Sequence, residues 1–528
     1  MGDIKSFSKE LLQLIGKGKI NSREELASLK GVISKKHGLK EIPSNPTILS
    51  FSTKRTPKQF EILSLKPTRS LSGLAVVAVM VPPHDCPGKC IYCPSSLLEG
   101  KDVPKSYTGN EPAAMRGVLA DFNPKIQIAG RLRQLDEIGH SIAKIELVVM
   151  GGTFLSMPYS FQKKFMLSCI NTISGTRARS IEKAKQLAMT ADRRITGITF
   201  ETRPDYCGSK EIDSMLSFGG TRCELGVQTI SDKIYKKIRR GHTVKDVVNA
   251  TSLLKDSAFK TTYHFMPGLP GSSLDQDEAA LKELFSNPDF MPDSLKLYPC
   301  LVMPNTELFK QWKKGLFSPI NTEQAMDLVL RMKRFVPRWV RIMRIQRDIP
   351  SNLVEAGVDR TNLRQMALDA AEKKGIKCKC IRCREAGLLS RSKGKQVGLE
   401  TAKEFVEEYR ASNGIEKFIS IESKDRESLF GFLRLRVPGS PFRKEISKDT
   451  ALVRELRVFG KSLALGEREK GRIQHSGLGK KLLAKAEEIA ADEFDAKKLL
   501  VISALGTKQY YRSLGFDFDG AYVSKFLR

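Results

Sequence analysis

The stretch that decides the fold is GLAVVAVMVPPHDCPGKCIYCPSS, residues 73–96. Residues 73–81 form a nearly continuous apolar run rich in valine, which is typical of a strand buried on both faces of a parallel sheet. Two prolines end the run, and the loop behind them carries Cys86, Cys90 and Cys93. Thiols at the spacing C-x3-C-x2-C can bind zinc or three irons of a four-iron cluster. The sequence therefore predicts a metal-binding loop directly after a buried strand.

Five more segments with strand character follow this first strand, and helical patterns separate them. The six expected strands are residues 73–81, 144–150, 195–200, 221–228, 259–265 and 293–300. The helical patterns include residues 126–139, 160–174, 208–218 and 243–257. Strands that alternate with helices form a parallel sheet, most simply a partial or full (β/α) barrel. The fold class that we predict is therefore α/β.

The distinctive short motifs of this region all follow the ends of the expected strands. The motif GGT (151–153) comes after the second strand, ETRPD (201–205) after the third and MPGLPG (266–271) after the fifth, while Gln228 ends the fourth. In a (β/α) barrel the loops after the strand carboxyl ends form the active site. We therefore expect one site to gather the cysteine loop and these motifs.

Net charge is the clearest bulk property of the chain. Its 89 lysines and arginines exceed its 59 acidic residues, which gives a net charge of +30 and a pI near 9.7. Residues 1–70 alone hold 14 basic and six acidic residues. This distribution favours a polyanionic partner such as nucleic acid over the plainer interpretation of a soluble basic protein. We expect residues 1–70 to form a basic, helical, RNA-binding region.

The sequence shows no signal for membrane insertion or secretion. The longest apolar run, residues 71–83, is shorter than the roughly 18 residues of a membrane helix and ends in two prolines. Residues 1–30 lack the apolar core of a signal peptide. Six of the ten cysteines lie in two tight clusters, which indicates metal binding in a reducing compartment rather than disulfides. We therefore expect a cytoplasmic protein without a membrane partner.

The cysteine loop resembles the signature of the radical S-adenosylmethionine (SAM) enzymes, including the aromatic Tyr92 before the third cysteine. The resemblance implies that Cys86, Cys90 and Cys93 bind a 4Fe-4S cluster whose fourth iron binds the methionine part of SAM. One electron, from a donor that would be a further partner, then cleaves a C–S bond of SAM to give a 5'-deoxyadenosyl radical. A structural zinc site is the alternative. It needs a fourth ligand, for which His84 is available, and it leaves the barrel unexplained.

The same resemblance implies contacts to SAM on the loop after the second strand. That loop usually ends in an acid in this family, whereas this chain has Gly151, Gly152 and Thr153. The amino group of SAM would therefore meet backbone and a hydroxyl group here.

Four further residues complete the expected barrel site. By the resemblance, Glu201 and Arg203 would meet the ribose and the carboxylate of SAM, with Gln228 nearby. Taken singly, each is explained as well by a surface ion pair or a strand-end cap. Lys296 lies on the sixth expected strand, where a buried lysine needs a reason. We expect Lys296 to act as an active-site base or to contact substrate.

The carboxyl-terminal part of the chain carries a second cofactor pattern. Residues 449–458 predict a strand, and RIQHSGLGKKLLAKAEEIA (472–490) predicts an amphipathic helix opened by a glycine-rich turn. Amide N–H groups at such a helix start can bind a pyrophosphate. A strand at 497–504 and the segment TKQYYRSLGFDFDG (507–520) follow. A Rossmann unit is excluded, because a second βα unit and an acid about 20 residues further on are missing.

This succession resembles the GNAT acetyltransferase domain, whose YYxxxGF element places a tyrosine beside the sulfur of acetyl-CoA. The resemblance implies a GNAT-type α/β domain that binds acetyl-CoA, with Tyr510 and Tyr511 as catalytic residues. The implied contacts to acetyl-CoA are Gln474, His475, Ser476, Gly477, Leu478, Gly479, Lys480 and Tyr511.

Over nearly its whole length the chain resembles the tRNA wobble-uridine acetyltransferase family, to which the catalytic subunit of Elongator belongs. The stretches that carry this resemblance include SYTGNEPAAMRG (106–117), HSIAKIELVVMGGTF (140–154) and FDFDGAYVSK (516–525). It implies that the radical removes a hydrogen from the methyl group of acetyl-CoA. The carbon radical adds to carbon 5 of the wobble uridine of tRNA, and thioester hydrolysis leaves carboxymethyluridine. The short spacing between Cys86 and Cys90 indicates an archaeal or bacterial type of enzyme.

Between the two expected cofactor domains lies KCKCIRCREAG, residues 377–387. Cys378, Cys380 and Cys383 suit a zinc knuckle that fixes the angle between the domains. The fourth ligand would be Cys300, a histidine or water, and free buried thiols are the alternative.

The sequence thus divides into four parts with one preferred function. The parts are residues 1–70 (RNA binding), 71–345 (radical SAM barrel), 346–395 (linker with the zinc knuckle) and 396–528 (acetyltransferase). The competing function is a protein lysine acetyltransferase, such as a histone acetyltransferase, that uses the barrel as a scaffold. A pure RNA-binding adaptor would leave both cofactor patterns unexplained. The sequence leaves open whether the chain forms a homodimer.

Overall fold

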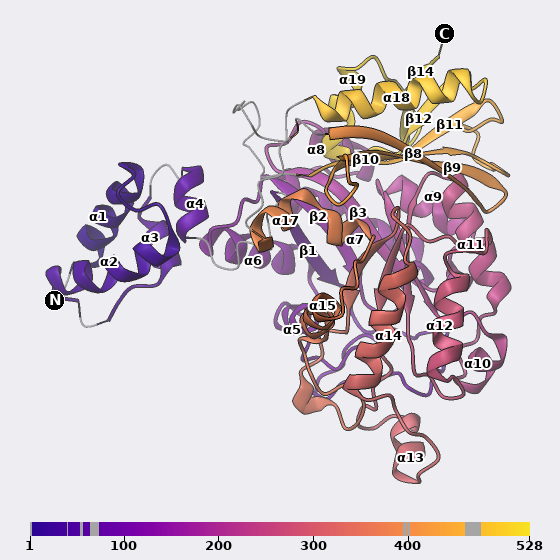
Figure 1. The fold of residues 1–528 in the computed structure, drawn as a ribbon, viewed down its shortest axis with the longest axis horizontal. Coiled ribbons are helices and arrows are strands. Elements are labelled where there is room, and N and C mark those ends of the chain that lie inside the picture. Colours follow the sequence, from indigo (N-terminus) through magenta and orange to yellow (C-terminus); the bar gives the residue numbers. More distant parts are fainter. Residues whose placement is uncertain are drawn as a thin grey trace.

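The structure is a computed structural model. It describes residues 3–39, 41–52, 56–63, 73–393, 399, 402–459 and 477–527. Two seven-stranded sheets, one above the other in Figure 1, form the main body, and a small helical unit lies to one side of it.

The amino-terminal unit is helical, as predicted. It consists of α1 (Ile4–Gly16), α2 (Arg23–Lys36), α3 (Asn45–Ser50) and α4 (Pro57–Leu63). Side chains at the starts of α1, α2 and α3 accept hydrogen bonds from the first helical amides, which explains where these helices begin. The helices share a small core of their own, which includes Phe7, Leu11 and Ile48. The unit can therefore present its lysines on a separate folded surface.

The first sheet is an open parallel sheet whose strands follow one another in sequence order. Its strands are β1 (Leu74–Met80), β2 (Lys144–Met150), β3 (Arg194–Thr202), β4 (Arg222–Gln228), β5 (Lys260–Phe265), β6 (Ser294–Leu297) and β7 (Arg341–Ile345). In the described part of the chain the outer strands β1 and β7 do not pair with each other, so the barrel is partial. The six predicted strands are confirmed, and β7 is a strand that the sequence did not predict.

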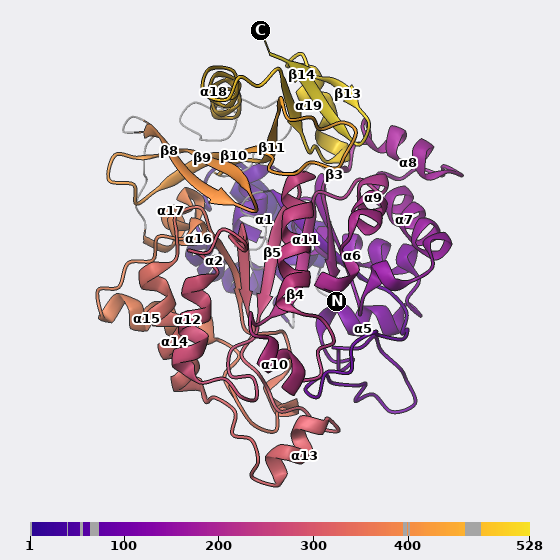
Figure 2. The same cartoon turned by 90° about the vertical axis from the view of Figure 1, so that its right-hand side faces the viewer.

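Helices connect the strands, and most of them cover the outer face of the sheet, whereas α13 projects from its lower end in Figure 2. They are α5 (Pro112–Leu119), α6 (Pro124–Glu137), α7 (Tyr159–Ser174), α8 (Ile181–Ala188), α9 (Ser209–Ser217), α10 (Asp232–Lys237), α11 (Val244–Asp256), α12 (Leu274–Glu283), α13 (Glu307–Lys313) and α14 (Thr322–Phe335). The alternation of each strand sends residues such as Val77 and Val79 into this apolar layer, where they are fully buried.

The second sheet is mixed, in the order β13-β14-β12-β11-β10-β9-β8. Its strands are β8 (Ala402–Ala411), β9 (Gly414–Ser423), β10 (Leu429–Val437), β11 (Thr450–Val458), β12 (Lys498–Val501), β13 (Asp517–Asp519) and β14 (Tyr522–Phe526). The pair β11 and β12 is parallel, and α18 (Leu478–Asp492) forms the connection between them, while α19 (Lys508–Arg512) follows β12. The predicted strands at 449–458 and 497–504 correspond to β11 and β12.

The second sheet packs against the amino-terminal ends of the barrel strands through buried ion pairs. Arg454 donates to the carboxylate of Asp293, the residue before β6, at 2.5 and 2.9 Å. Arg436 donates to the carboxylate of Asp256, at the end of α11, at 2.5 and 2.8 Å. All four side chains are almost completely buried. The second sheet therefore closes the end of the barrel opposite to the cysteine loop.

The segment between the two sheets is folded and packed. It contains α15 (Leu363–Lys373), α16 (Ile381–Arg384) and α17 (Ala386–Lys393). Leu363 belongs to the barrel core, and Ile381 shares a cluster with Phe418 and Phe432 of the second sheet. Among the described residues, no helix has the length and apolar character that crossing a membrane requires.

Candidate active site

A cavity lies at the carboxyl ends of the barrel strands, and all three cysteines of the first motif line it. Its wall draws on the cysteine loop and on residues at the ends of β2, β3, β4, β5 and β6. Among these residues are Gly152, Thr153, Glu201, Arg203, Gln228 and Lys296. The structure therefore brings together the motifs that the sequence placed after separate strands.

Backbone hydrogen bonds fix the cysteine loop. The N–H of Ile91 donates to the carbonyl of Ile238 at 3.1 Å, and the carbonyl of Ile91 accepts from the N–H of Leu308 at 2.9 Å. Burial, together with the neighbouring thiols of Cys90 and Cys86, raises the pKa of Cys93 to about 11. A raised pKa keeps this thiol neutral at pH 7. A bound metal would therefore be needed to stabilise the thiolate that ligates it.

The spacing of the three sulfurs distinguishes a cluster from a single ion. The Sγ atoms of Cys86, Cys90 and Cys93 do not all lie within 4.8 Å of one another. Sulfurs around one tetrahedral zinc lie about 3.8 Å apart, because each Zn–S bond is about 2.3 Å. The ring nitrogens of His84 lie 3.2 Å from the carbonyl of Pro82 and 3.3 Å from that of Thr153, so His84 does not complete a zinc site. The spacing of these thiols therefore disfavours a single tetrahedral ion and is compatible with the wider four-iron cluster.

Two side chains of the cavity wall, Arg203 and Gln228, each have a buried polar atom without a partner in the described part of the chain. Arg203 donates through Nε and Nη2 to Asp205 at 2.9 and 2.8 Å, and through Nη2 to the carbonyl of Arg240 at 2.9 Å. Its Nη1 has no partner among the described residues, and neither has Oε1 of Gln228. Gln228 ends β4 with a left-handed φ of 70°. A ligand that carries both a carboxylate and hydrogen-bond donors, as SAM does, would satisfy both atoms.

The glycine motif shapes the wall beside the cysteine loop. Gly151 and Gly152 have φ values of 110° and 62°, which favour glycine. A Cβ at Gly152 would lie 2.9 Å from the ring of His84, and one at Gly151 would lie 2.9 Å from Sδ of Met80. Gly152 and Thr153 line the cavity, whereas Gly151 packs beneath it. Of the three, Gly152 and Thr153 are therefore placed to touch a ligand.

Lys296 reaches into the barrel and pairs with two carboxylates. Its Nζ hydrogen-bonds to Glu224 and lies 3.5 Å from Glu201. His264 lies 2.9 Å from the same carboxylate of Glu224. Burial lowers the pKa of Lys296, but Glu224, Tyr298 and Glu201 together raise it well above its usual value. The lysine is therefore held protonated, which disfavours the predicted base and retains the predicted substrate contact.

Sequence reasoning missed several residues of this cavity. Tyr107 donates to Glu201 at 3.2 Å, and Arg347 lies over the ring of Tyr107. Glu224 and His264 line the cavity too. The period of two along β4, counted back from Gln228, was a signal that could have identified Glu224. No comparable pattern pointed to Tyr107, which lies on a long loop.

The start of α18 forms the second candidate site. Gly477 precedes the helix with a left-handed φ of 85°. A Cβ at Gly479 would lie 3.2 Å from the hydroxyl of Tyr510, which is 39% exposed. Tyr511 instead packs against Phe516 in the core of the second sheet. Tyr510, rather than Tyr511, therefore presents its hydroxyl group at the helix start.

Only some of the other residues predicted to contact acetyl-CoA at the start of α18 lie in the described part of the chain. Leu478 is half-buried and Lys480 exposed on the first turn of α18. Gln474, His475 and Ser476 lie outside the described residues. The described part of the site thus consists of the helix start and Tyr510.

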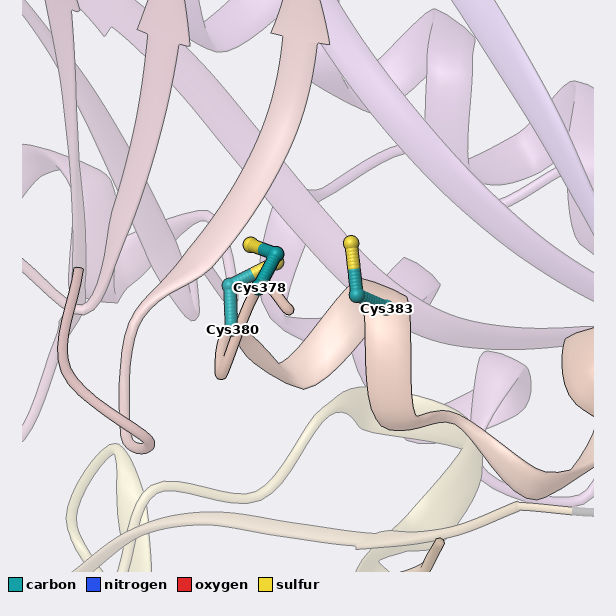
Figure 3. A group of neighbouring side chains, drawn as sticks. All are labelled: Cys378, Cys380 and Cys383. Carbon is teal, nitrogen blue, oxygen red and sulfur yellow. The ribbon is translucent and has the colours of Figure 1, made fainter. Parts of the chain in front are cut away.

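Cys378, Cys380 and Cys383 form a compact group at the start of α16 (Figure 3). Their Sγ atoms all lie within 4.8 Å of one another, which suits one tetrahedral ion. The two neighbouring thiols lower the pKa of Cys380 well below its usual value, which favours a thiolate. Cys300 does not join the group, which disfavours it among the three candidates for the fourth ligand, a histidine and water being the other two. Cys300 is buried three residues after the end of β6, where burial and, to a lesser extent, the charge of Asp277 raise the pKa of its thiol.

Comparison with known proteins agrees with this geometry. A model of the radical SAM superfamily matches residues 80–284, and a model of the radical SAM C-terminal domain matches residues 292–373. The tRNA uridine(34) acetyltransferase of Methanocaldococcus jannaschii is 46% identical over 98% of this chain and 97% of its own length. Elongator complex protein 3 of Schizosaccharomyces pombe is 39% identical over 99% of this chain and 98% of its own. The solved structure of the archaeal Methanocaldococcus infernus Elp3 with an N-terminal deletion superposes with a TM-score of 0.77 at 44% identity, over 86% of this chain and 99% of that one.

Proposed function

The chain belongs to the radical SAM family of the tRNA uridine(34) acetyltransferases and Elongator complex protein 3, and from this premise we propose that it converts the wobble uridine of tRNA into carboxymethyluridine with acetyl-CoA. The observation that carries the proposal is the cavity that is lined by three thiols, by Arg203, whose Nη1 has no partner among the described residues, and by the amide of Gln228. The same chain adds a glycine-opened helix with Tyr510 beside it. The competing lysine acetyltransferase would use only the second of these sites.

In this proposal Cys86, Cys90 and Cys93 hold a 4Fe-4S cluster, which supplies one-electron cleavage of SAM and depends on an external electron donor. Arg203 binds the carboxylate of SAM with its free Nη1, and Asp205 holds the guanidinium in place. Gln228 accepts a hydrogen bond through Oε1. Thr153 offers backbone and hydroxyl groups to the amino group of SAM.

The proposed acetyl-CoA site lies at the start of α18. The first amides of the helix are capped by none of the side chains that the structure describes and would face the pyrophosphate, and the helix dipole adds about half a positive charge there. Lys480 is exposed on the same turn. Tyr510 carries the only hydroxyl that the described part of this site places beside Gly479, so it would position or protonate the thiolate of CoA.

The proposed RNA surface combines the amino-terminal helices with the mouth of the barrel cavity. The helical unit holds an excess of lysine, and Lys105, Arg344 and Arg347 line the cavity wall. Lys296 would hydrogen-bond a carbonyl oxygen of the uracil ring from inside the barrel. Cys378, Cys380 and Cys383 would hold one zinc ion between the domains, with a fourth ligand from outside the described side chains.

One labelling experiment tests the proposal. Acetyl-CoA with a trideuterated methyl group is given to the reconstituted protein with SAM, reductant and tRNA. The proposed route loses one deuterium before the new C–C bond forms, so deuterium should appear in 5'-deoxyadenosine and two deuteriums in the carboxymethyl group on tRNA. Three deuteriums retained in acetyl groups on protein lysines, with none in deoxyadenosine, would establish the competing function instead.

A further inference from the structure

Arg240 is a buried arginine for which neither the fold nor the proposed cofactor contacts give a role. It follows α10 in the connection between β4 and α11, and only 8% of it is exposed. Its guanidinium lines the same cavity as the cysteines. Its neighbour Arg239, by contrast, is exposed.

The contacts of Arg240 aim its guanidinium at one cysteine. Nη2 donates to the carbonyl of Gly226 at 2.6 Å, and Nη1 donates to Sγ of Cys90 at 3.5 Å. A Cβ at position 226 would lie 2.7 Å from Nη2, so β4 has a glycine where the arginine crosses it. The carbonyl of Arg240 itself accepts from Arg203. One residue thus joins the cysteine loop to the residue that would bind SAM.

The charge of Arg240 needs an anion that the described residues do not otherwise supply. No carboxylate of the described chain forms an ion pair with it. A buried cation without a counter-ion is costly. The side chain that Nη1 of Arg240 contacts is Cys90, whose sulfur would carry the negative charge of a thiolate when it binds iron. Fixing the loop does not require this arginine, because the backbone bond from Ile91 to Ile238 already ties the same two segments together.

We propose that Arg240 is a positioning residue that raises the reduction potential of the 4Fe-4S cluster through a charged N–H···S hydrogen bond to the Cys90 ligand. This inference rests on the cluster of the proposed function. Reduction adds one negative charge to the cluster, and a nearby cation and hydrogen bonds to its sulfurs stabilise the more negative form. Arg240 would make one-electron reduction easier before SAM is cleaved.

A redox titration of the reconstituted full-length chain tests this inference. An electrode sets the potential, and soluble redox mediators equilibrate it with the protein. The EPR signal of the reduced cluster reports the reduced fraction. Arg240→Met should lower the reduction equilibrium constant at least tenfold, which for one electron is about 59 mV. Arg239→Met removes the same charge from the same loop but from an exposed position, so it should change the constant less than twofold.

The outcomes separate this inference from the proposed function. If the unaltered chain holds no iron, the proposed function fails. If Arg240→Met holds iron and keeps its potential, or if Arg239→Met shifts it equally, only the role of Arg240 fails. Should Arg240→Met lose its iron, Arg240→Gln decides, because its amide can still donate a hydrogen bond to Gly226 but carries no charge. An unchanged potential in Arg240→Gln would then overturn the inference, and a lowered one would support it.

Discussion

Replacing Gly88 by alanine tests whether the cysteine loop and Arg203 form one binding site. A Cβ at Gly88 would lie 2.2 Å from Nη1 and 3.2 Å from Cζ of Arg203. Atoms that touch without bonding normally stay about 3.5 Å apart, so the arginine or the loop must move by about 1 Å. The φ of Gly88 is not left-handed, so the backbone itself accepts alanine. The change therefore acts through the clash alone.

The size of the effect follows from what Arg203 would lose. It is held by two hydrogen bonds to Asp205 and one to the carbonyl of Arg240. Breaking one charged hydrogen bond costs about 2 kcal/mol, which is about 30-fold in a binding constant. We therefore expect SAM to bind Gly88→Ala about 30-fold more weakly.

Equilibrium binding of SAM to the reconstituted protein measures this prediction. Gly130→Ala is the matched control, because Gly130 is exposed in α6 and a Cβ there meets no atom within 4 Å. Iron content is measured in parallel to show whether the loop still holds the cluster. If Gly88→Ala binds SAM as tightly as Gly130→Ala with the same iron content, the reasoning about Arg203 is wrong.

Three further predictions concern buried charges and thiols. Lys296→Met should lower the free energy of unfolding by about 3 kcal/mol, because Glu224 loses its buried partner, and adding Glu224→Gln should restore most of it in urea unfolding. Cys380→Ser should remove the proposed zinc ion, which elemental analysis would show as a loss of one equivalent per chain. Burial lowers the pKa of Lys255 from 10.5 to about 8, so the unfolded chain binds one more proton between these pH values and the stability of the wild type should rise with pH there. Lys255→Met should lack this rise, and an equal rise in both proteins would contradict it.

Most of the barrel could be predicted because its strands are mainly apolar and largely buried. Such strands read as short apolar runs, as LAVVAVM in β1 does, and their loops carry residues with recognisable chemistry. The positions of Glu201, Arg203 and Gln228 at one cavity then follow from the parallel order of the strands. The sequence did not predict which side chains hydrogen-bond to one another in the cavity. The bond between Tyr107 and Glu201 is an example, because it joins residues far apart in the sequence.

The missed elements have a common physical cause. The strand β7 reads RIMRI, in which Arg341 and Arg344 interrupt the apolar pattern. The strand β8 alternates exposed charges with half-buried residues, so its pattern has little apolar content. Tyr510 and Tyr511 are neighbours in sequence, and only the packing of Phe516 shows which of them is buried. In each case tertiary contacts decide what local sequence leaves open.

The same buried charges predict that the barrel does not fold without the second sheet. Removing residues 394–528 would leave Asp256 without Arg436 and without the N–H groups of Gly439 and Ser440. Asp293 would keep only the hydrogen bonds of Thr261 and the distant Lys255. Each uncompensated carboxylate costs about 3 kcal/mol or more, and two of them consume much of the 5–15 kcal/mol that stabilises a typical domain.

Circular dichroism during urea unfolding of the fragment 1–393 tests this last prediction. We expect no cooperative transition, or one at a much lower urea midpoint than in the full chain. Replacing both carboxylates by amides, Asp256→Asn with Asp293→Asn, should improve the fragment but weaken the full chain, because amides need no buried counter-ion yet cannot pair with the arginines. This opposite sign distinguishes lost ion pairs from a general loss of apolar contact, which would affect both proteins alike. A fragment that unfolds at the midpoint of the full chain would show that the barrel does not depend on these pairs.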